Sequence, residues 1–383
     1  MKVAQEAKEL QAKGENVIDL SVGEPDFPTP QNIKNAAIRA IENNFTKYTL
    51  NAGTIELRKA IAEKLKKENG LDYSPNEIIV SAGAKQSIYN AVQALIYNDD
   101  EAIIAAPYWV SYPEIVTLAH GKPVIVNASE ENGFKLTAQQ ISEAVTPQTK
   151  LLILCNPCNP TGAAYSKKEL EEIAEVVEEK KLFVISDEIY EKLVYDDFKF
   201  VSFASLSEKI KSRTIVVNGL SKAYSMTGWR IGYAAASQEI INALNKIQSH
   251  STSNASSISQ AAAVEALIGP QDSLEVMRKE FERRRNFLYD SITSIEGIKC
   301  HKPEGAFYLF PNVSEYFNKS THVFKITNSF DLAMYLLYEE KIATVPGSAF
   351  GAEGYIRISY STSMEQLEEG ARRLKEAFKK MSV

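Results

Sequence analysis

The 383-residue sequence predicts an α/β protein with a mostly parallel, seven-stranded sheet and a smaller α+β part toward its carboxyl end. Seven short apolar runs follow one another between residues 77 and 236. Most of them are apolar throughout rather than alternating, as in strands that are covered on both faces. Helical patterns separate many of the runs, and such alternation of strands and helices produces parallel sheets.

The predicted strands are EIIVS (77–81), AIIAA (102–106), PVIVN (123–127), LLILC (151–155), LFVIS (182–186), TIVVN (214–218) and IGYAAA (231–236). Between them, residues 84–96 have the apolar stripe of an amphipathic helix. The helix predicted at 166–181 opens with Ser166 and Glu169 in the spacing of a capping box.

The chain is longer than a single hydrophobic core usually supports, so we expect a second, smaller domain. A long charged helix leads into a different pattern, with short strand-like segments at 305–313 and 354–361. We therefore predict a large α/β domain of residues 25–280, and a small α+β domain of residues 1–24 and 281–383.

Charge and hydropathy argue against several partners and locations. A net charge of −6 is unfavourable for binding nucleic acid or an anionic membrane. No apolar run approaches the ~18 residues that a membrane span needs. The amphipathic pattern that ends at Gly14 lacks the apolar core of a signal peptide. We expect a cytoplasmic protein with neither a nucleic-acid nor a membrane partner.

Metal and redox chemistry are not expected. Three cysteines are too few for a disulfide framework. Cys155 and Cys158 have a C-x-x-C spacing, but no second pair accompanies them, which disfavours a zinc site or a redox motif. The histidines are scattered without an H-E-x-x-H spacing: His120, His250, His301 and His322.

Ligands of open α/β sheets bind outside the carboxyl ends of the strands, so the residues that follow each run are candidates for a site. Ser81, Gly83 and Ala84 follow the first run and open a helix, whose N–H groups and dipole suit a phosphate. Trp109 follows the second run and could stack on a planar ring, or could be an ordinary core residue. Asn159 offers an amide after the fourth run. A dinucleotide-binding G-x-G-x-x-G is absent from the sequence.

The last four candidates follow the fifth and sixth runs. Asp187 and Tyr190 are three residues apart, and the segment GLSKAYSMTGWR (219–230) contains Lys222 and Arg230. These two cations are either surface charges of a loop, or a nucleophilic amine beside an anion-binding group. One sheet edge would thus hold a phosphate-binding loop, an aromatic ring, a carboxylate and a lysine. These groups are what pyridoxal phosphate requires, since its aldehyde forms a Schiff base with lysine.

Several motifs, in order along nearly the whole chain, carry a resemblance to a known family. The chain closely resembles the class I aminotransferases of fold type I, and among them the bacterial-type aspartate aminotransferase subgroup. The matching segments are VIDLSVGEPDFPTP (17–30), KYT (47–49), APYWVSYPE (106–114), NPCNPTG (156–162), SDEIYE (186–191), SKAYSMTGWRIGY (221–233) and IRISYS (356–361).

This resemblance implies a role for each candidate residue. Lys222 corresponds to the Schiff-base lysine that also moves the proton at the substrate Cα, and Asp187 to the carboxylate that keeps the cofactor's ring nitrogen protonated. Tyr190 and Asn159 correspond to groups that bond the ring's 3′ oxygen. The remaining cofactor-binding residues that the resemblance implies are Ser81, Gly83, Ala84, Trp109, Ser221, Arg230 and, from the neighbouring subunit, Tyr48.

For the substrate, the resemblance implies that Arg357 grips the α-carboxylate with its planar guanidinium, and that Gly23 contributes a backbone contact. Trp109 and Asn159 also belong to this substrate set. Lys85 corresponds to a lysine that binds the distal carboxylate of acidic substrates, and a solvent-facing helix cation is the less favoured alternative.

The implied activity is transamination of an amino acid, expected to be aspartate, with a 2-oxo acid, expected to be 2-oxoglutarate, in a homodimer with shared active sites. An aromatic or broad-specificity aminotransferase, a prephenate aminotransferase and a β-lyase use the same cofactor motifs and remain alternatives. Members of the subgroup usually carry a further segment ahead of the position of Met1, which implies a contribution of that segment to dimer contact and site closure.

Overall fold

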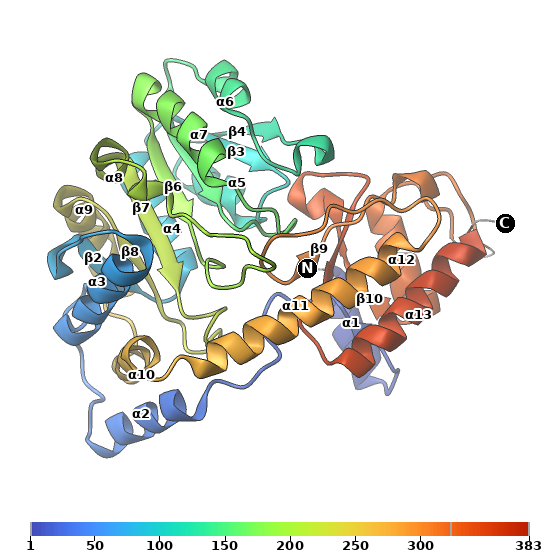
Figure 1. The fold of residues 1–383 in the computed structure, drawn as a ribbon, viewed down its shortest axis with the longest axis horizontal. Coiled ribbons are helices and arrows are strands. Elements are labelled where there is room, and N and C mark those ends of the chain that lie inside the picture. Colours follow the sequence, from blue (N-terminus) through green and yellow to red (C-terminus); the bar gives the residue numbers. More distant parts are fainter. Residues whose placement is uncertain (1, 322–323, 382–383) are drawn as a thin grey trace.

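A seven-stranded sheet organises the larger part of the molecule in the computed structural model, which describes residues 2–321 and 324–381 (Figure 1). In spatial order its strands are β2 (Ile78–Ser81), β8 (Gly232–Ala235), β7 (Thr214–Gly219), β6 (Phe183–Asp187), β5 (Thr149–Cys155), β3 (Glu101–Ala106) and β4 (Lys122–Asn127). All neighbours are parallel except β8, which is antiparallel to β2 and to β7. The predicted mostly parallel sheet is confirmed, with each predicted run forming a strand.

Helices cover both faces of this sheet. They are α3 (Ile55–Asn69), α4 (Ala84–Leu95), α5 (Ser111–Leu118), α6 (Ala138–Ala144), α7 (Lys167–Lys180), α8 (Glu208–Arg213), α9 (Gln238–Ser249) and α10 (Ser257–Ile268). Successive residues of β5 separate two cores, because Leu152 packs with α6 and α7 whereas Ile153 packs with α4, α5 and α9. Continuous apolar runs are therefore required here. The exception is the edge strand β4, which is partly exposed.

The helix predicted at 166–181 shows why the sequence folds locally as expected. The Ser166 side chain accepts a hydrogen bond from the Glu169 N–H, and the Glu169 carboxylate accepts from the Ser166 N–H, so the predicted capping box forms. Leu170, Ile173 and Val177 are buried against the sheet. The helix ends where Lys181 adopts a left-handed conformation.

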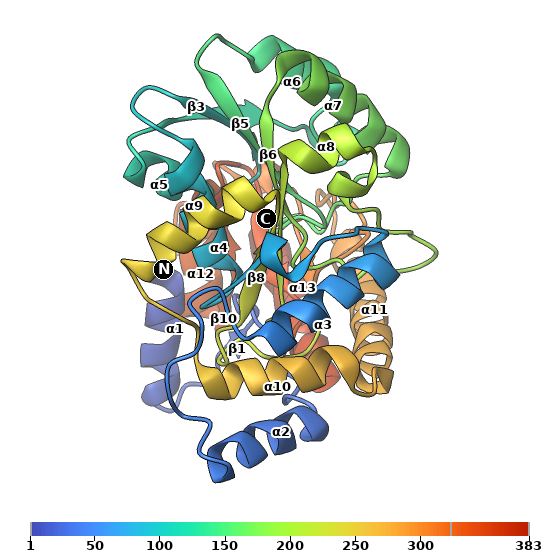
Figure 2. The ribbon, with the colours of Figure 1, turned by 90° about the vertical axis from the view of Figure 1, so that its left-hand side faces the viewer.

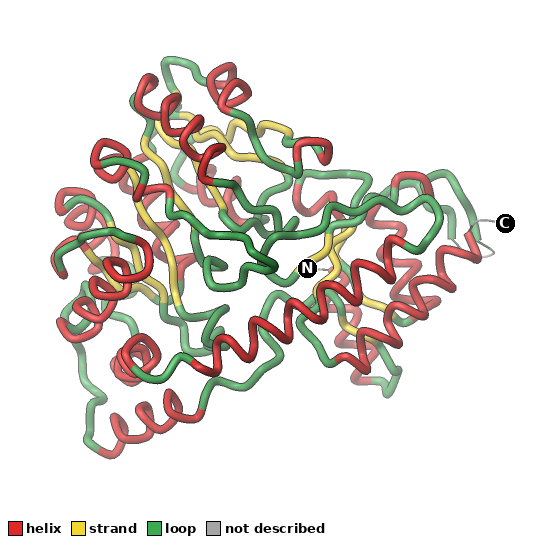
Figure 3. The backbone as a smooth tube through the Cα atoms, in the orientation of Figure 1, coloured by secondary structure: helices red, strands yellow, loops and turns green. Residues whose placement is uncertain are grey.

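A smaller α+β part lies beside the large sheet (Figures 1 and 3). Its two small sheets are the pair of β1 (Ile18–Asp19) with β10 (Ile342–Ala343), and the three strands β11 (Val345–Pro346), β12 (Ile356–Ser359) and β9 (Tyr308–Leu309). Its helices are α1 (Lys2–Ala12), α12 (Ser329–Glu340) and α13 (Met364–Met381). Short 3₁₀ helices occupy Pro75–Glu77, Glu130–Asn132, Phe203–Ser205, Ser314–Tyr316 and Gly347–Phe350 of the chain.

One helix connects the two parts. The 22-residue α11 (Asp272–Thr293) extends from the large sheet to the smaller one (Figure 1). The division into residues 25–280 and residues 1–24 with 281–383 remains a prediction, and its second boundary falls inside this continuous helix.

Helix α2 (Gln31–Glu42) packs beside α10 of the large part (Figure 2). Among the described residues, no helix combines the length and the apolar character needed to cross a lipid bilayer.

Candidate active site

Three strand ends bring most of the predicted residues to one edge of the large sheet. β6 ends at Asp187, and the turn after it carries Tyr190. β7 ends at Gly219 and is followed by Lys222, while β2 ends at Ser81 and leads into α4. Because β8 is antiparallel to both β2 and β7, these strands run in the same direction and their carboxyl ends share an edge.

The Lys222 amine lies at this edge and is partly buried. Its Nζ donates a hydrogen bond to the Gly23 carbonyl oxygen at 2.5 Å, and it is 5.8 Å from the ring centre of Tyr190. Burial, together with the Arg357 charge, lowers the pKa of Lys222 to about 8, although Glu24 and Asp187 act in the opposite direction. The amine can therefore lose its proton near neutral pH, as a nucleophile must.

Asp187 is a carboxylate in a dry environment. Only 5% of its surface is exposed, and its Oδ2 accepts a hydrogen bond from the Tyr112 hydroxyl at 2.6 Å. Burial raises the pKa of Asp187 to about 6, despite the opposing effects of the Tyr112 and Ile189 hydrogen bonds and of the Lys222 charge. A cation placed against this carboxylate would offset the cost of its burial.

Arg357 reaches the same region from β12 of the smaller sheet. Its Nη1 donates to the Asn159 side-chain oxygen at 2.9 Å, and its Nη2 donates to the Ser21 carbonyl at 2.8 Å. The guanidinium stacks over the Tyr308 ring at 4.3 Å and is 7% exposed. Its Nε is buried without a partner in the described chain. Asn159 and Arg357, 198 positions apart, thus lie in one cluster.

The start of α4 forms a cradle with Arg230. Gly83 precedes the helix at φ +90°, and a Cβ on it would lie 2.3 Å from Arg230 Nη2, so glycine is required for this approach. Ala84 begins the helix, and no side chain caps its amino end. Its uncapped N–H groups and the adjacent guanidinium form an anion site of the predicted kind.

The two serines of the predicted cradle differ. The Ser81 hydroxyl is fully buried and bonded to the Gly83 carbonyl at 3.0 Å and the Ser87 hydroxyl at 2.6 Å. The Ser221 hydroxyl, in contrast, has no hydrogen-bond partner among the described residues. Ser221 therefore retains the capacity to bind an anion, whereas Ser81 supports the shape of the loop.

Trp109 and Lys85 meet beside the cradle. The Lys85 amine is 4.8 Å from the centre of the Trp109 ring, and that ring packs edge-on against Tyr112 at 5.3 Å. Burial and the nearby Arg230 charge lower the pKa of Lys85. Its contact with Trp109 places the Lys85 amine beside the site, although Lys85 as a whole residue is exposed.

Tyr48 lies apart from these residues. It belongs to the segment between α2 and α3 and is 92% exposed. Within the described chain, no hydrogen bond or ring contact joins it to another predicted site residue. Its expected role in a neighbouring subunit stays a prediction.

The residues that come together fit pyridoxal phosphate. A lysine with a lowered pKa suits its aldehyde, a buried carboxylate suits its ring nitrogen, and the cradle of α4 and Arg230 suits its phosphate. The Nε of Arg357, which is buried without a partner among the described residues, is a group that a bound ligand could satisfy.

Sequence reasoning missed two tyrosines of this site. Tyr112 bonds Asp187, and Tyr308 lies between Tyr190 and Arg357. Tyr112 could have been found, because it stands three residues after Trp109 at the start of a helix. The spacing around Tyr308 gives no such signal, since a tyrosine in an apolar run is normally a core residue.

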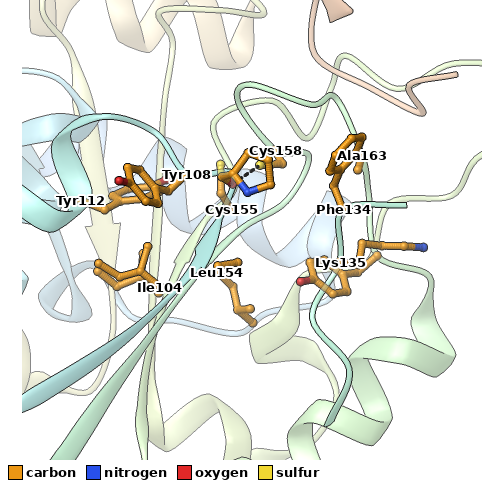
Figure 4. A pocket seen from close by; sticks show the side chains of 13 residues that line it. Ile104, Tyr108, Tyr112, Phe134, Lys135, Leu154, Cys155, Cys158 and Ala163 are labelled. Atoms are coloured by element: carbon orange, nitrogen blue, oxygen red, sulfur yellow. Dashed lines mark hydrogen bonds between the residues drawn. The ribbon is translucent and has the colours of Figure 1, made fainter. Parts of the chain in front are cut away.

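A small cavity of about 20 Å³ lies beneath the site, lined in part by Tyr112, Cys155 and Cys158 (Figure 4). It has room for about one water molecule. The cysteines are free thiols, and the Cys158 Sγ donates weakly to the Pro107 carbonyl at 3.9 Å. In the part of the chain that the structure describes, which excludes His322, no group of three potential metal ligands is found.

Comparisons with known proteins agree with this geometry. A model of the family "Aminotransferase class I and II" matches residues 15–374. An aspartate aminotransferase of Bacillus sp. (strain YM-2) is 50% identical, covering 97% of this chain and 94% of its own. A probable aspartate/prephenate aminotransferase of Rickettsia felis is 50% identical, covering 100% and 94%. The crystal structure of an aspartate aminotransferase from Rhizobium meliloti superposes with a TM-score of 0.96 at 45% identity, over 99% of this chain and 96% of that one.

Proposed function

The chain belongs to the class I and II aminotransferases, and from this premise we propose that it transfers the amino group of aspartate to 2-oxoglutarate, with pyridoxal phosphate held at Lys222. The observation that carries the proposal is the meeting, at one sheet edge, of a lysine of lowered pKa with a buried carboxylate. Relatives named as aspartate aminotransferases, about half identical over nearly the whole chain, support the choice of substrate.

When bound, pyridoxal phosphate accepts the electrons that are released when the Cα–H bond of the amino acid breaks. Lys222 holds the cofactor and then moves the proton from the substrate Cα, for which its lowered pKa is suited. Asp187 keeps the ring nitrogen charged, because ionic pairing favours both charged partners. Tyr190 and Asn159 orient the ring through its 3′ oxygen, and Trp109 covers its face.

The substrate is held at two ends. Arg357 binds the α-carboxylate, and its Nε is the buried polar atom that still requires a partner. Gly23, whose carbonyl already accepts from Lys222, adds a backbone contact. Lys85 binds the distal carboxylate that aspartate and glutamate share. A relative described as an aspartate/prephenate aminotransferase keeps a prephenate acceptor as the second candidate.

An exposed apolar surface supports a homodimer with shared active sites. α2 and the segment after it expose Ile38 at 50%, Ile41 at 52% and Leu50 at 62%, next to Tyr48. Exposed large apolar side chains that gather in one region of a protein are typical of an interface. Tyr48 then reaches the phosphate of the neighbouring subunit. The cytoplasmic location stays a prediction from the sequence.

The decisive experiment combines chemistry and substrate choice. The purified protein is loaded with pyridoxal phosphate, reduced with borohydride and mapped by peptide analysis, and we expect the label on Lys222. Label on another lysine would overturn the site. In parallel, aspartate, glutamate, alanine and phenylalanine are compared as donors, with 2-oxoglutarate and prephenate as acceptors. Aspartate with 2-oxoglutarate should have the highest kcat/KM, and a preference for phenylalanine would overturn the substrate assignment.

A further inference from the structure

A buried phenol lies at the junction of three residues of the site. Tyr308 is 0% exposed, and its Oη is 2.9 Å from the Tyr190 Oη. The same oxygen is 3.5 Å from the position that a Cβ on Gly23 would take. The face of its ring lies 4.3 Å from the Arg357 guanidinium. Tyr308 thus contacts groups that belong to the cofactor side and to the substrate side.

The two phenols come from different parts of the fold. Tyr190 follows β6 of the large sheet, whereas Tyr308 stands in β9 and pairs with Ser359 of β12, two residues from Arg357. Their hydrogen bond therefore joins the large sheet to the strand pair that carries Arg357. Burial raises the pKa of both tyrosines, so each keeps its hydroxyl hydrogen at neutral pH.

The number of hydrogens sets the direction of this bond. Each phenol has a single O–H to donate, and its oxygen can also accept. If Tyr190 donates to the 3′ oxygen of the cofactor, the only hydrogen left for the pair is that of Tyr308. Tyr308 must then donate to Tyr190.

We propose that Tyr308 is a positioning residue with two roles, a proposal that rests on the proposed function. Its hydroxyl donates to Tyr190 and directs the Tyr190 O–H at the cofactor. Its ring fixes the plane of the Arg357 guanidinium. Successive hydrogen bonds polarise one another, so the first bond strengthens the donation by Tyr190. A stronger donation stabilises negative charge on the 3′ oxygen and weakens the hold on the proton at the Lys222 nitrogen.

The ring has a separate task. Nη1 and Nη2 of Arg357 are bonded to Asn159 and to the Ser21 carbonyl, and the cation lies 4.3 Å from the ring centre of Tyr308 and 5.1 Å from that of Phe350. Cation–π stacking of this kind fixes the tilt of the guanidinium. The ring should therefore influence carboxylate binding even when the hydroxyl is absent.

The test uses the full-length enzyme loaded with pyridoxal phosphate and three variants. Tyr308→Phe removes the hydroxyl alone, and Tyr308→Leu removes the ring as well. Tyr360→Phe is the matched control, because Tyr360 is also 0% exposed in the same region but bonds the Ala306 carbonyl at 3.2 Å. Two quantities are measured: the midpoint of the pH-dependent absorbance change of the bound cofactor, and the dissociation constant of succinate from its spectral titration.

We expect Tyr308→Phe to raise the absorbance midpoint by roughly 0.2–0.6 pH unit, because the proton is held more tightly at the Lys222 nitrogen. Its succinate dissociation constant should stay within about twofold of wild type, whereas Tyr308→Leu should raise that constant about threefold to tenfold. Tyr360→Phe should change neither quantity.

An unmoved midpoint in Tyr308→Phe, or an equal movement in Tyr360→Phe, would overturn the role of the hydroxyl. Succinate binding by Tyr308→Leu at wild-type strength would overturn the role of the ring. A wild-type protein whose bound cofactor shows no pH-dependent absorbance and no attachment to Lys222 would overturn the proposed function itself, and this inference with it.

Discussion

Asp187 shows how a single residue of the site can oppose stability. Its pKa of about 6 lies above the ordinary 3.8 because the carboxylate is buried. The folded chain therefore binds this proton more tightly than the unfolded chain does. Ionisation of Asp187 destabilises the protein progressively as the pH rises from 4 toward 6, and by about 3 kcal/mol at most above that range.

We predict that Asp187→Asn without cofactor unfolds at a higher temperature than wild type at pH 7.5, and that the gap closes as the pH falls toward 4. The amide cannot ionise, yet it can still accept from Tyr112. Adding pyridoxal phosphate should stabilise wild type more than the variant, because only the carboxylate pairs with a charged ring. Thermal unfolding across pH, with and without cofactor, measures both effects. A variant less stable than wild type at pH 7.5 would contradict this account.

In the proposed function, Lys85 separates acidic substrates from the others. There Arg357 would bind the carboxylate that every amino acid has, whereas the Lys85 amine, beside Trp109, would meet only a second carboxylate. We predict that Lys85→Ala lowers kcat/KM for aspartate and glutamate about tenfold to a hundredfold, the value of a charge-assisted hydrogen bond of ~1.5–3 kcal/mol. Alanine as donor, assayed with the same preparation, should change little. Equal losses for all donors would assign Lys85 to the cofactor or to the fold.

Residues that follow an apolar run could be predicted, since the edge of a parallel sheet is a property of the strand pattern. Lys222 and Asp187 were found in this way. Tyr112 was missed although it stands only three residues after Trp109. Tyr308 was missed because a hydrogen bond between distant side chains leaves no periodic trace in the sequence. The predicted roles of the individual residues derive from the resemblance to a family, and the geometry adds which of them meet.

At the scale of elements, the start of α4 and the loop between β7 and β8 jointly form the cradle that we propose for the cofactor's phosphate. We predict that Gly83→Ala raises the dissociation constant of pyridoxal phosphate at least tenfold, since the added Cβ would displace the Arg230 guanidinium. Gly70→Ala is the control, because Gly70 also has a positive φ, of +69°, but open space around it. That control should lose about 1 kcal/mol of stability and retain cofactor affinity. A similar loss of affinity in both variants would point to backbone strain alone.

The direction of one strand was beyond sequence reasoning. The run at 231–236 would have the same apolar composition in a parallel or an antiparallel strand. Its composition therefore does not reveal that the strand is reversed. As β8 is antiparallel, it begins at the site edge, and Arg230 stands just before it. The exposure of β4 was equally hidden, because strand order rather than composition decides which strand is at the edge.

For the whole molecule, association of two chains is the property to test. We predict that Ile41→Glu, on the apolar surface of α2, shifts the protein from dimer to monomer in sedimentation experiments and lowers activity at low protein concentration. A charge at an apolar interface is costly because it loses its hydration. Val276→Glu is the control, since Val276 is 66% exposed on a different helix, α11. Unchanged association of the Ile41→Glu variant would place the interface elsewhere.

The pairing of β1 with β10 has a consequence for synthesis on the ribosome. Ile18 emerges early, but its partner Ile342 is made 324 residues later, which takes roughly 15–65 s at ordinary elongation rates. Arg357, whose guanidinium bonds the Ser21 carbonyl, emerges later still. The nascent large sheet can therefore form while the first strand waits unpaired. The contact between Arg357 and the start of the chain therefore forms only after the large sheet has been made, and a chain truncated before residue 342 would keep Lys222 yet lack Arg357.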